Sequence, residues 1–308
     1  MPQGVYLPEG RLLDERRNQI QTESTEGLLQ AWQRGMILEG VATMCDEKRN
    51  LYVRLGRERG RIPRSEAGLG ADRGKMREIA ILSRVGKPVC FRIIGRDGTD
   101  WLLSRRSVQE EADAWFRREL LPGEVIQATV THLEQFGAFV DIGCGLVSMI
   151  GIENISVSRI RHAGDRFKVG QRVLAVVSHL EAGGHICLTH RELLGTWKQN
   201  ADLLRPGSAV RGIIRGVENY GVFVELFPNL SGLAESCQGA EPGMAASVYI
   251  KSILPDRMKI KLAILDKMPG EGKRLIGPED YFIREGRLRR WIYQPEQCST
   301  RCVESEFT

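Results

Sequence analysis

Alternating apolar and polar residues mark the centre of the chain as β structure. Ile126, Ala128 and Val130 alternate with polar residues, which is the period of a half-buried strand. Glycines and charged residues separate several short apolar runs, and each segment between turns has room for about five strands. A unit this small buries an open sheet poorly, and closing the sheet removes its exposed edges. The pattern therefore predicts small β-barrels.

Three segments of the chain are similar to one another. They open at Gly35, Gly123 and Gly207, which lie 88 and 84 residues apart. Thirteen residues after the second and third of these glycines comes the same motif, an aromatic residue followed by Gly, a small residue, Phe and Val. Agreement at several offsets indicates duplication. We predict five segments: an N-terminal arm 1–33, repeats at 34–110, 119–196 and 203–266, and a C-terminal tail 267–308.

One aromatic residue in each of the last two repeats lies on the wrong face for a core residue. In the second repeat, alternation turns the apolar neighbours of Phe139 inward, so Phe139 lies on the polar face with Asp141. In the third repeat, Phe223 lies with Glu225 in the same way. Packing in the core does not explain a large ring on the polar face of two repeats.

A second aromatic precedes each of these by three residues. Strict alternation would turn Phe136 and Tyr220 inward, but a bulge at Gly137 and Gly221 would return both rings to the outer face. Two exposed rings side by side form a platform on which successive bases of a single strand stack, at roughly 1–3 kcal/mol per base. The alternative is that the rings cap the barrel or pack under a linker helix.

The second and third repeats resemble the S1 RNA-binding domain. The resemblance is carried by the opening glycine, the aromatic-Gly-small-Phe-Val strand, a Gly-Leu pair at 145–146 and 232–233, and a late Ile-x-Leu strand. The first repeat matches only at its ends, and the whole arrangement is similar to ribosomal-protein-S1-like proteins of Gram-positive bacteria. The resemblance implies a mainly β chain of three tandem five-stranded barrels of the S1/OB type, joined by short helices, with the first barrel degenerate.

The resemblance also implies which residues form the RNA face. In the family this face holds the two aromatics, a histidine after Gly-Leu, and an acidic and a basic residue near the last strand. The histidine position is Ser148 in the second repeat and Glu235 in the third, and the late basic position is His185 and Lys259. Because Glu235 would repel phosphate, we expect the third repeat to bind RNA more weakly or to bind a protein surface.

Charge is distributed unevenly among the repeats. Residues 35–108 hold 16 basic and 9 acidic residues, residues 121–195 hold 6 and 7, and residues 205–265 hold 7 and 5. The basic first repeat has Lys48 and Leu51 at the offsets of the aromatic pair. This suggests that the first repeat holds the RNA backbone or docks on the ribosome, while the others stack on bases. The alternative is a solvated surface with a loop rich in arginine: Arg57, Arg59, Arg61 and Arg64.

Short stretches with helical spacing precede the repeats, and each carries a tryptophan: Trp32, Trp115 and Trp197. We expect these rings to pack the linkers onto the barrels, with stacking on RNA as the alternative. In the tail, the arginine-rich stretch 284–290 is followed by Trp291 and Tyr293. This stretch predicts either a further RNA contact or a packed helix.

Composition limits the remaining possibilities. The net charge of +5 is a mild lean toward polyanions, and no apolar run reaches the about 18 residues that span a bilayer. The N-terminus lacks the pattern of a secretory signal, and seven scattered cysteines do not suggest disulfides, so we expect a cytoplasmic protein. Cys298 and Cys302 form only a weak metal motif, and we interpret them as free thiols.

Enzymatic motifs fail on spacing. The glycine-rich stretch 68–75 has Leu69 and Met76 where a phosphate loop needs Gly and Ser or Thr, and the five histidines show no metal-ligand spacing. The arm and the tail are too short for a catalytic domain. We expect no catalytic site, cofactor, metal, membrane contact or small-molecule substrate.

Two functional hypotheses remain. The first is binding of single-stranded RNA, namely messenger RNA at the small ribosomal subunit during translation. The second is an interaction protein, or an accessory of RNA decay or transcription, whose barrels contact protein partners.

Overall fold

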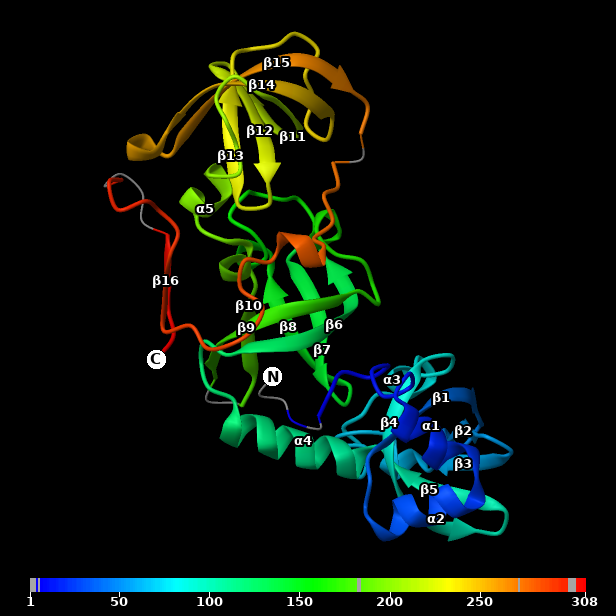
Figure 1. The fold of residues 1–308 in the computed structure, drawn as a ribbon. Helices are drawn as coiled ribbons and strands as arrows, with labels where there is room; N and C mark the ends of the chain where they lie inside the picture. The colour runs from blue at the N-terminus through cyan, green and yellow to red at the C-terminus, as the bar shows by residue number, and fades with distance from the viewer. Residues whose placement is uncertain (1–3, 5, 182–183, 271, 299–302) are drawn as a thin grey trace.

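The computed structural model describes residues 4, 6–181, 184–270, 272–298 and 303–308. Three closed five-stranded barrels follow one another in an elongated arrangement, the first at the bottom and the third at the top of Figure 1. The prediction of a mainly β chain of three barrels is confirmed. No helix among the described residues is long and apolar enough to cross a membrane.

The first barrel is complete, although its sequence diverges from the other two. Its strands follow the order β1-β2-β3-β5-β4, and a parallel contact between β3 and β5 closes it. The strands are β1 (Leu38–Cys45), β2 (Leu51–Leu55), β3 (Glu58–Ile62), β4 (Pro88–Asp97) and β5 (Asp100–Ser104). Their alternate apolar side chains form a core that also receives Leu28 and Ala31 from the arm.

The second and third barrels share this topology. In the second, the strands are β6 (Val125–Glu134), β7 (Gly137–Gly143), β8 (Leu146–Gly151), β9 (Arg172–Leu180) and β10 (Ile186–Thr189). In the third, they are β11 (Ala209–Glu218), β12 (Gly221–Phe227), β13 (Leu230–Ala234), β14 (Ala245–Leu254) and β15 (Lys259–Met268). The same parallel closure joins β8 to β10 and β13 to β15.

Short helices join and flank the barrels. They are α1 (Arg16–Glu23), α2 (Thr25–Gln33), α3 (Glu78–Leu82), α4 (Arg106–Glu119) and α5 (Trp197–Ala201). Helix α4 links the first two barrels and buries Val108, Ala112 and Phe116, which recur at helical spacing on one face. Trp197 is buried at the start of α5, as predicted, whereas Trp115 is half-buried and Trp32 is 40% exposed.

The N-terminal arm is a structural part of the first junction. The Glu9 carboxylate pairs with Arg105 at 2.7 Å and accepts a hydrogen bond from the Cys90 N–H, while the Glu9 N–H donates to Asp141 of the second barrel at 2.7 Å. Burial opposes the charge on Glu9, but Arg105 and Arg84 hold the pKa of Glu9 below its usual value. The arm therefore ties the first barrel to the second.

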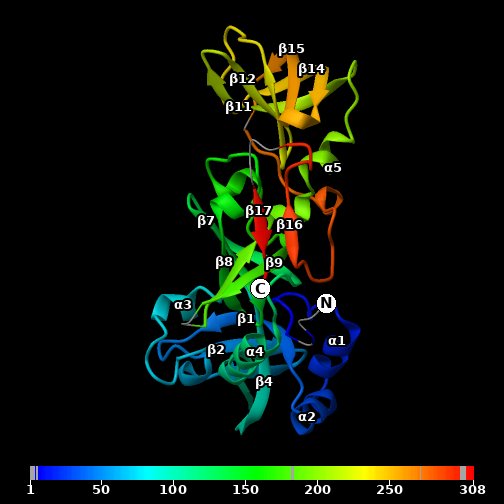
Figure 2. The same ribbon diagram turned by 90° about the vertical axis from the view of Figure 1, so that its left-hand side faces the viewer.

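The C-terminal tail returns along the second barrel (Figures 1 and 2). The Ile276 N–H donates to the Arg166 carbonyl, the Leu288 N–H donates to the Gly123 carbonyl, and β16 (Arg290–Ile292) pairs with β17 (Glu304–Glu306). Trp291 and Tyr293 are buried against the third barrel. The expected packed helix is wrong: β16 is a strand, and the two rings that were expected to follow a helix fill the core of the third barrel. An RNA contact by the arginines stays a prediction. Of the two tail cysteines, Cys298 is buried and Cys302 lies outside the described residues.

A buried ion-pair network joins the second and third barrels. Glu225 of β12 accepts hydrogen bonds from Arg166 at 2.6 Å and from Arg215 at 2.7 Å, and both Glu225 and Arg166 are fully buried. Asp141, expected beside Phe139 on an open polar face, is buried as well, under the arm. Only part of each polar face is therefore open to a ligand.

Candidate nucleic-acid interface

The structure brings the two aromatics of the second barrel together on its surface. Phe136 is 55% exposed in the turn before β7, Phe139 is half-buried on β7, and their ring centroids lie 6.0 Å apart at an interplanar angle of 89°. Perpendicular rings form a corner rather than a flat platform. A base that stacks on one ring therefore meets the edge of the other.

The third barrel repeats this corner. Tyr220 is 68% exposed, and its ring lies 6.1 Å from that of Phe223 at 90°. The expected bulge at Gly137 and Gly221 is wrong in detail. The bulge lies on the partner strand, and each glycine instead allows close packing, since a Cβ there would lie 2.4 Å from a carbonyl oxygen of the next strand. Phe136 and Tyr220 are exposed because they belong to the turn.

Strand register defines a row of side chains across each barrel, one from each strand, which we call the outer row. In the second barrel it is His132, Phe139, Met149, Cys187 and His179. In the third it is Gly216, Phe223, Leu233, Lys261 and Ser252. Register partners point to the same face of a sheet, and all of these residues are at least partly exposed.

The first barrel also has an aromatic in its outer row. The row is Met44, Tyr52, Arg61, Leu102 and Gly95, so Tyr52 takes the place of Phe139. The expectation that Lys48 and Leu51 occupy the aromatic positions is wrong. The first β-hairpin is one residue longer than the others, which moves the ring from 16 to 17 residues after the opening glycine. The alternation of apolar Leu51 and Val53 around Tyr52 was the sequence signal that places the Tyr52 ring on the outer face.

Tyr52 differs from its counterparts because charged groups cover it. The Arg59 guanidinium lies 5.2 Å from the ring centre, and the Tyr52 hydroxyl donates to Asp46 at 3.2 Å. Burial and the Asp46 carboxylate raise the pKa of Tyr52 above its usual value. Both the face and the hydroxyl of this ring already have partners.

The arginines around Tyr52 are paired with acidic side chains. Arg59 contacts Asp100 at 2.7 Å, and Arg61 contacts Asp97 at 2.5 Å. The alternative that assigned these arginines to a loop is wrong for Arg59 and Arg61, which lie on β3. The two arginines beside Tyr52 are therefore already paired with acidic partners.

Ser148 does not lie on the outer face. It is 9% exposed, and its hydroxyl donates to the Ile186 carbonyl. Ser148 pairs in register with core residue Val140, as Gly232 pairs with Val224 in the third barrel. The Gly-Leu pairs of the two repeats are thus not equivalent, and the counterpart of Glu235 is Gly151. Met149 follows Phe139 by ten residues, and Leu233 follows Phe223 by ten residues. Counting from the phenylalanine of each repeat would therefore have found the correct register.

Comparison with known proteins agrees with this geometry. Residues 119–191 match the family model described as the S1 RNA binding domain. The second barrel is an S1 domain. The curated relatives include the small ribosomal subunit protein bS1 homolog of Bacillus subtilis, 30% identical over 189 residues, which are 59% of this chain and 48% of that protein. Protein bS1 of Leuconostoc lactis is 30% identical over 176 residues, covering 55% and 40%. The chain spans about half the length of these relatives.

Two solved structures are similar over parts of the chain. A multidomain protein with nucleic acid binding domains from Streptococcus pneumoniae is 14% identical with a TM-score of 0.26, covering 75% of this chain and 74% of that one. GSP13 from Bacillus subtilis is 25% identical with a TM-score of 0.22, covering 23% and 56%.

The late basic positions differ between the S1 domain and the third barrel. Lys259 and Lys261 are both exposed on one face of β15, with buried Ile260 between them. In the S1 domain, His185 is exposed and lines, with Ser148, a cavity of about 390 Å³ against α4. No described contact joins His185 to the aromatic corner.

Glu235 is less repulsive than its sequence position suggests. Its carboxylate accepts a hydrogen bond from Lys251 at 2.6 Å, and this contact lowers the pKa of Glu235. Lys251 thereby balances the negative charge of Glu235, and the two lysines of β15 add further positive charge to this barrel. The outer row of the third barrel thus combines an aromatic corner with positive charge.

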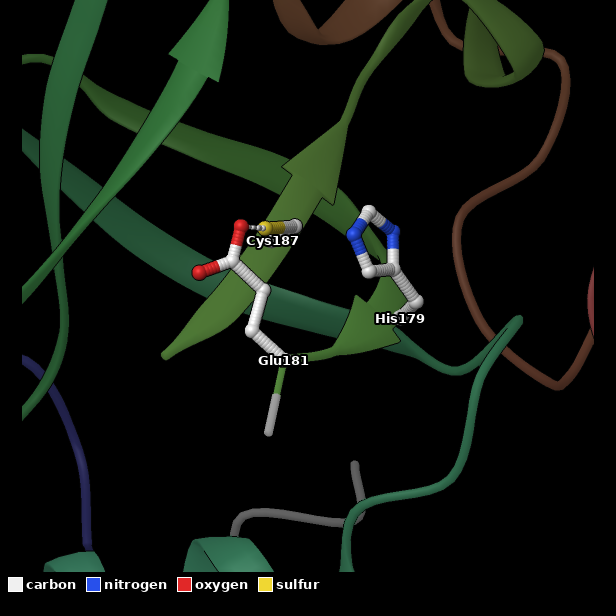
Figure 3. Close-up of side chains that lie close together, drawn as sticks. All are labelled: His179, Glu181 and Cys187. Atoms are coloured by element: carbon white, nitrogen blue, oxygen red, sulfur yellow. Dashed lines mark hydrogen bonds between the residues drawn. The ribbon is translucent and has the colours of Figure 1, made fainter. Parts of the chain in front are cut away.

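The S1 domain also brings together three side chains of types that can ligate a metal, a grouping that sequence spacing did not reveal. His179, Glu181 and Cys187 approach one another across the hairpin of β9 and β10 (Figure 3). His179 and Cys187 belong to the outer row itself.

Proposed function

We propose that this chain binds single-stranded RNA without catalysing a reaction, through the aromatic corners of the second and third barrels. The observation that carries the proposal is the recurrence of an exposed, perpendicular aromatic pair at equivalent places in two barrels. Sequence repetition alone does not require a ring with a largely exposed face, whereas stacking on bases does.

Stacking also explains why the ligand would be a single strand. The bases of a duplex are stacked on each other and cannot present their faces to a protein ring, whereas an unpaired base can. Each stack contributes roughly 1–3 kcal/mol, and lysines on the same face attract the backbone. In the third barrel, Lys261 lies two strands from Phe223 in the outer row, and Lys259 is exposed on the same face of β15.

We further propose that the RNA is messenger RNA held at the small ribosomal subunit, in the cytoplasm. The support is the similarity of residues 119–191 to the S1 RNA binding domain and of the chain to proteins named as bS1. The first barrel is better suited to docking on a protein partner than to stacking on bases. Arg59 covers the Tyr52 ring of its outer row, and the arginines beside that ring are paired with aspartates. This is the part of the alternative hypothesis, binding of a protein partner, that an observation supports.

The test is fluorescence-anisotropy binding of a short unstructured RNA and of its duplex. We expect the single strand to bind and the duplex to bind poorly. A Phe139→Ala/Phe223→Ala variant should lose about 2–6 kcal/mol, or at least about 30-fold in Kd, because it lacks two stacks. A Val169→Ala/Leu203→Ala variant, which trims two exposed apolar side chains outside the outer rows, should bind like the wild type. Equal binding by the phenylalanine variant and the wild type would overturn the proposal.

A further inference from the structure

Three side chains of different chemistry meet at one edge of the S1 domain. His179 lies on β9, Glu181 follows its end, and Cys187 lies on β10 opposite His179. One ligand atom from each lies within 4.8 Å of the others. Figure 3 shows a ring nitrogen of His179 turned toward Cys187 and Glu181, with the carboxylate beside the sulfur.

The spacing fits a tetrahedral metal ion. Metal–ligand distances of about 2.0–2.3 Å place neighbouring ligand atoms roughly 3.3–3.8 Å apart in a tetrahedron. The Cys187 Sγ already lies 3.4 Å from the Glu181 Oε1. His179 and Glu181 are exposed, so their side chains can close the remaining distance without disturbing the core.

A neighbouring hydroxyl fixes the imidazole. The Ser178 Oγ lies 3.2 Å from the His179 Nδ1. Metal-binding histidines commonly use one ring nitrogen for the ion and the other for such a partner. This contact leaves the Nε2 free to face Glu181 and Cys187.

We propose that His179, Glu181 and Cys187 bind a divalent ion of the zinc class and leave its fourth position open. A set of one nitrogen, one oxygen and one sulfur suits a borderline ion such as Zn²⁺, whereas Mg²⁺ and Ca²⁺ prefer oxygen alone. Three protein ligands give an open site, in which water or an oxygen of another molecule completes the tetrahedron.

The position of this ion suggests its role, and this step rests on the proposed RNA binding. Cys187 pairs with Met149, which pairs with Phe139, so the ion would lie two strand spacings, about 10 Å, from the ring. In the third barrel, the counterpart of Cys187 is Lys261. With its thiolate and carboxylate ligands the bound ion is neutral overall, so it would cancel the negative charge of Glu181 on this face, and its open position would accept a phosphate oxygen of RNA.

The binding step releases a proton. The ion binds Cys187 as the thiolate, and the thiol proton passes to solvent.

Titration of the whole 308-residue chain with Co²⁺ alone tests the site. We expect one equivalent to give a thiolate-to-cobalt absorption band in the near ultraviolet, which Zn²⁺ abolishes by competition. Cys187→Ser should remove the band, His179→Gln should weaken Co²⁺ binding by more than about 10-fold, and Ser178→Ala by about 10-fold. Cys237→Ser and Cys298→Ser, which change thiols elsewhere, should leave the band intact. Absence of the band in the wild type, or its persistence in Cys187→Ser, overturns the site.

A second readout separates the site from RNA binding. Zn²⁺ should tighten single-stranded RNA binding by the wild type and leave Cys187→Ser unchanged. A cobalt band with no effect of Zn²⁺ on RNA would confirm the site and overturn its role in RNA binding. A cobalt band in a protein that binds no RNA would confirm the site and contradict the proposed function.

Discussion

The outer rows of the first and third barrels share the same strand geometry, but the surfaces around their aromatic rings differ. Each has an aromatic ring on its second strand, Tyr52 in one and Phe223 in the other. In the first barrel, Arg59 covers the ring and Asp100 pairs with Arg59. In the third, the ring forms a corner with exposed Tyr220.

The comparison shows that the number of basic residues in a barrel does not tell how many of them are free to contact a ligand. Residues 35–108 have a surplus of seven basic residues (16 against 9), and residues 205–265 a surplus of only two (7 against 5). The arginines nearest the ring of the first barrel are nonetheless paired, while Lys259 and Lys261 of the third are exposed. Cross-strand neighbours decide which charges can meet a polyanion.

The largest expected effect comes from removing the third barrel's corner. A Tyr220→Ala/Phe223→Ala variant should lose about 2–6 kcal/mol of RNA-binding free energy, because two stacks are lost. Tyr52→Ala, the matched change in the first barrel, should change the affinity little. Both affinities are measured by fluorescence anisotropy at one salt concentration. A comparable loss in Tyr52→Ala would show that the covered ring also stacks, and the comparison would fail.

Acid should distinguish the second barrel from the first. Arg105 and His190 follow the last strands of these barrels at equivalent places; Arg105 is charged at any ordinary pH, whereas burial lowers the pKa of His190 to about 4. As the pH falls, His190 of the unfolded chain binds a proton near pH 6.5, whereas buried His190 of the folded chain binds it only near pH 4. The contribution of His190 to the free energy of unfolding should therefore fall by about 3 kcal/mol as the pH falls from 6.5 to 4.

Urea unfolding across this pH range measures the effect. His190→Gln removes the titrating ring, along with its contacts to the Ile155 carbonyl and the Tyr281 hydroxyl, so the variant should be less stable but should lose less stability than the wild type between pH 6.5 and 4. An unchanged slope in the variant would mean that His190 titrates normally.

A smaller effect should follow from freeing the arginines of the first barrel. In Asp97→Asn/Asp100→Asn, Arg59 and Arg61 lose their acidic partners. If RNA passes this face, the log–log salt dependence of binding should steepen by up to about 1.4, for two further phosphate contacts. Asp72→Asn, which alters an exposed pair elsewhere on this barrel, is the control. An unchanged slope would place the first barrel outside the RNA path.

The barrels and the two aromatic corners could be predicted because their signals are local. Alternation over a few residues and matched offsets place Phe139 and Phe223 on the outer face. Tyr52 and Ser148 were misplaced for one physical reason: hairpin and turn lengths differ between repeats, and a shift in register exchanges the inner and outer faces.

The packing of the arm and of the tail could not be predicted because their contacts are distant in sequence. The Glu9–Arg105 pair and the burial of Trp291 depend on how whole segments pack. His179 and Cys187 meet across a β-hairpin, at a spacing that no helical or knuckle motif describes.

The central claim is that RNA lies on the aromatic corners of the second and third barrels. The direct measurement is ultraviolet cross-linking of a short single-stranded RNA to the full chain, with the attached peptides identified by mass spectrometry. The account predicts cross-links at Phe136 and Phe139, and at Tyr220 and Phe223, with none at Tyr52. Cross-links confined to the first barrel or the tail would contradict it.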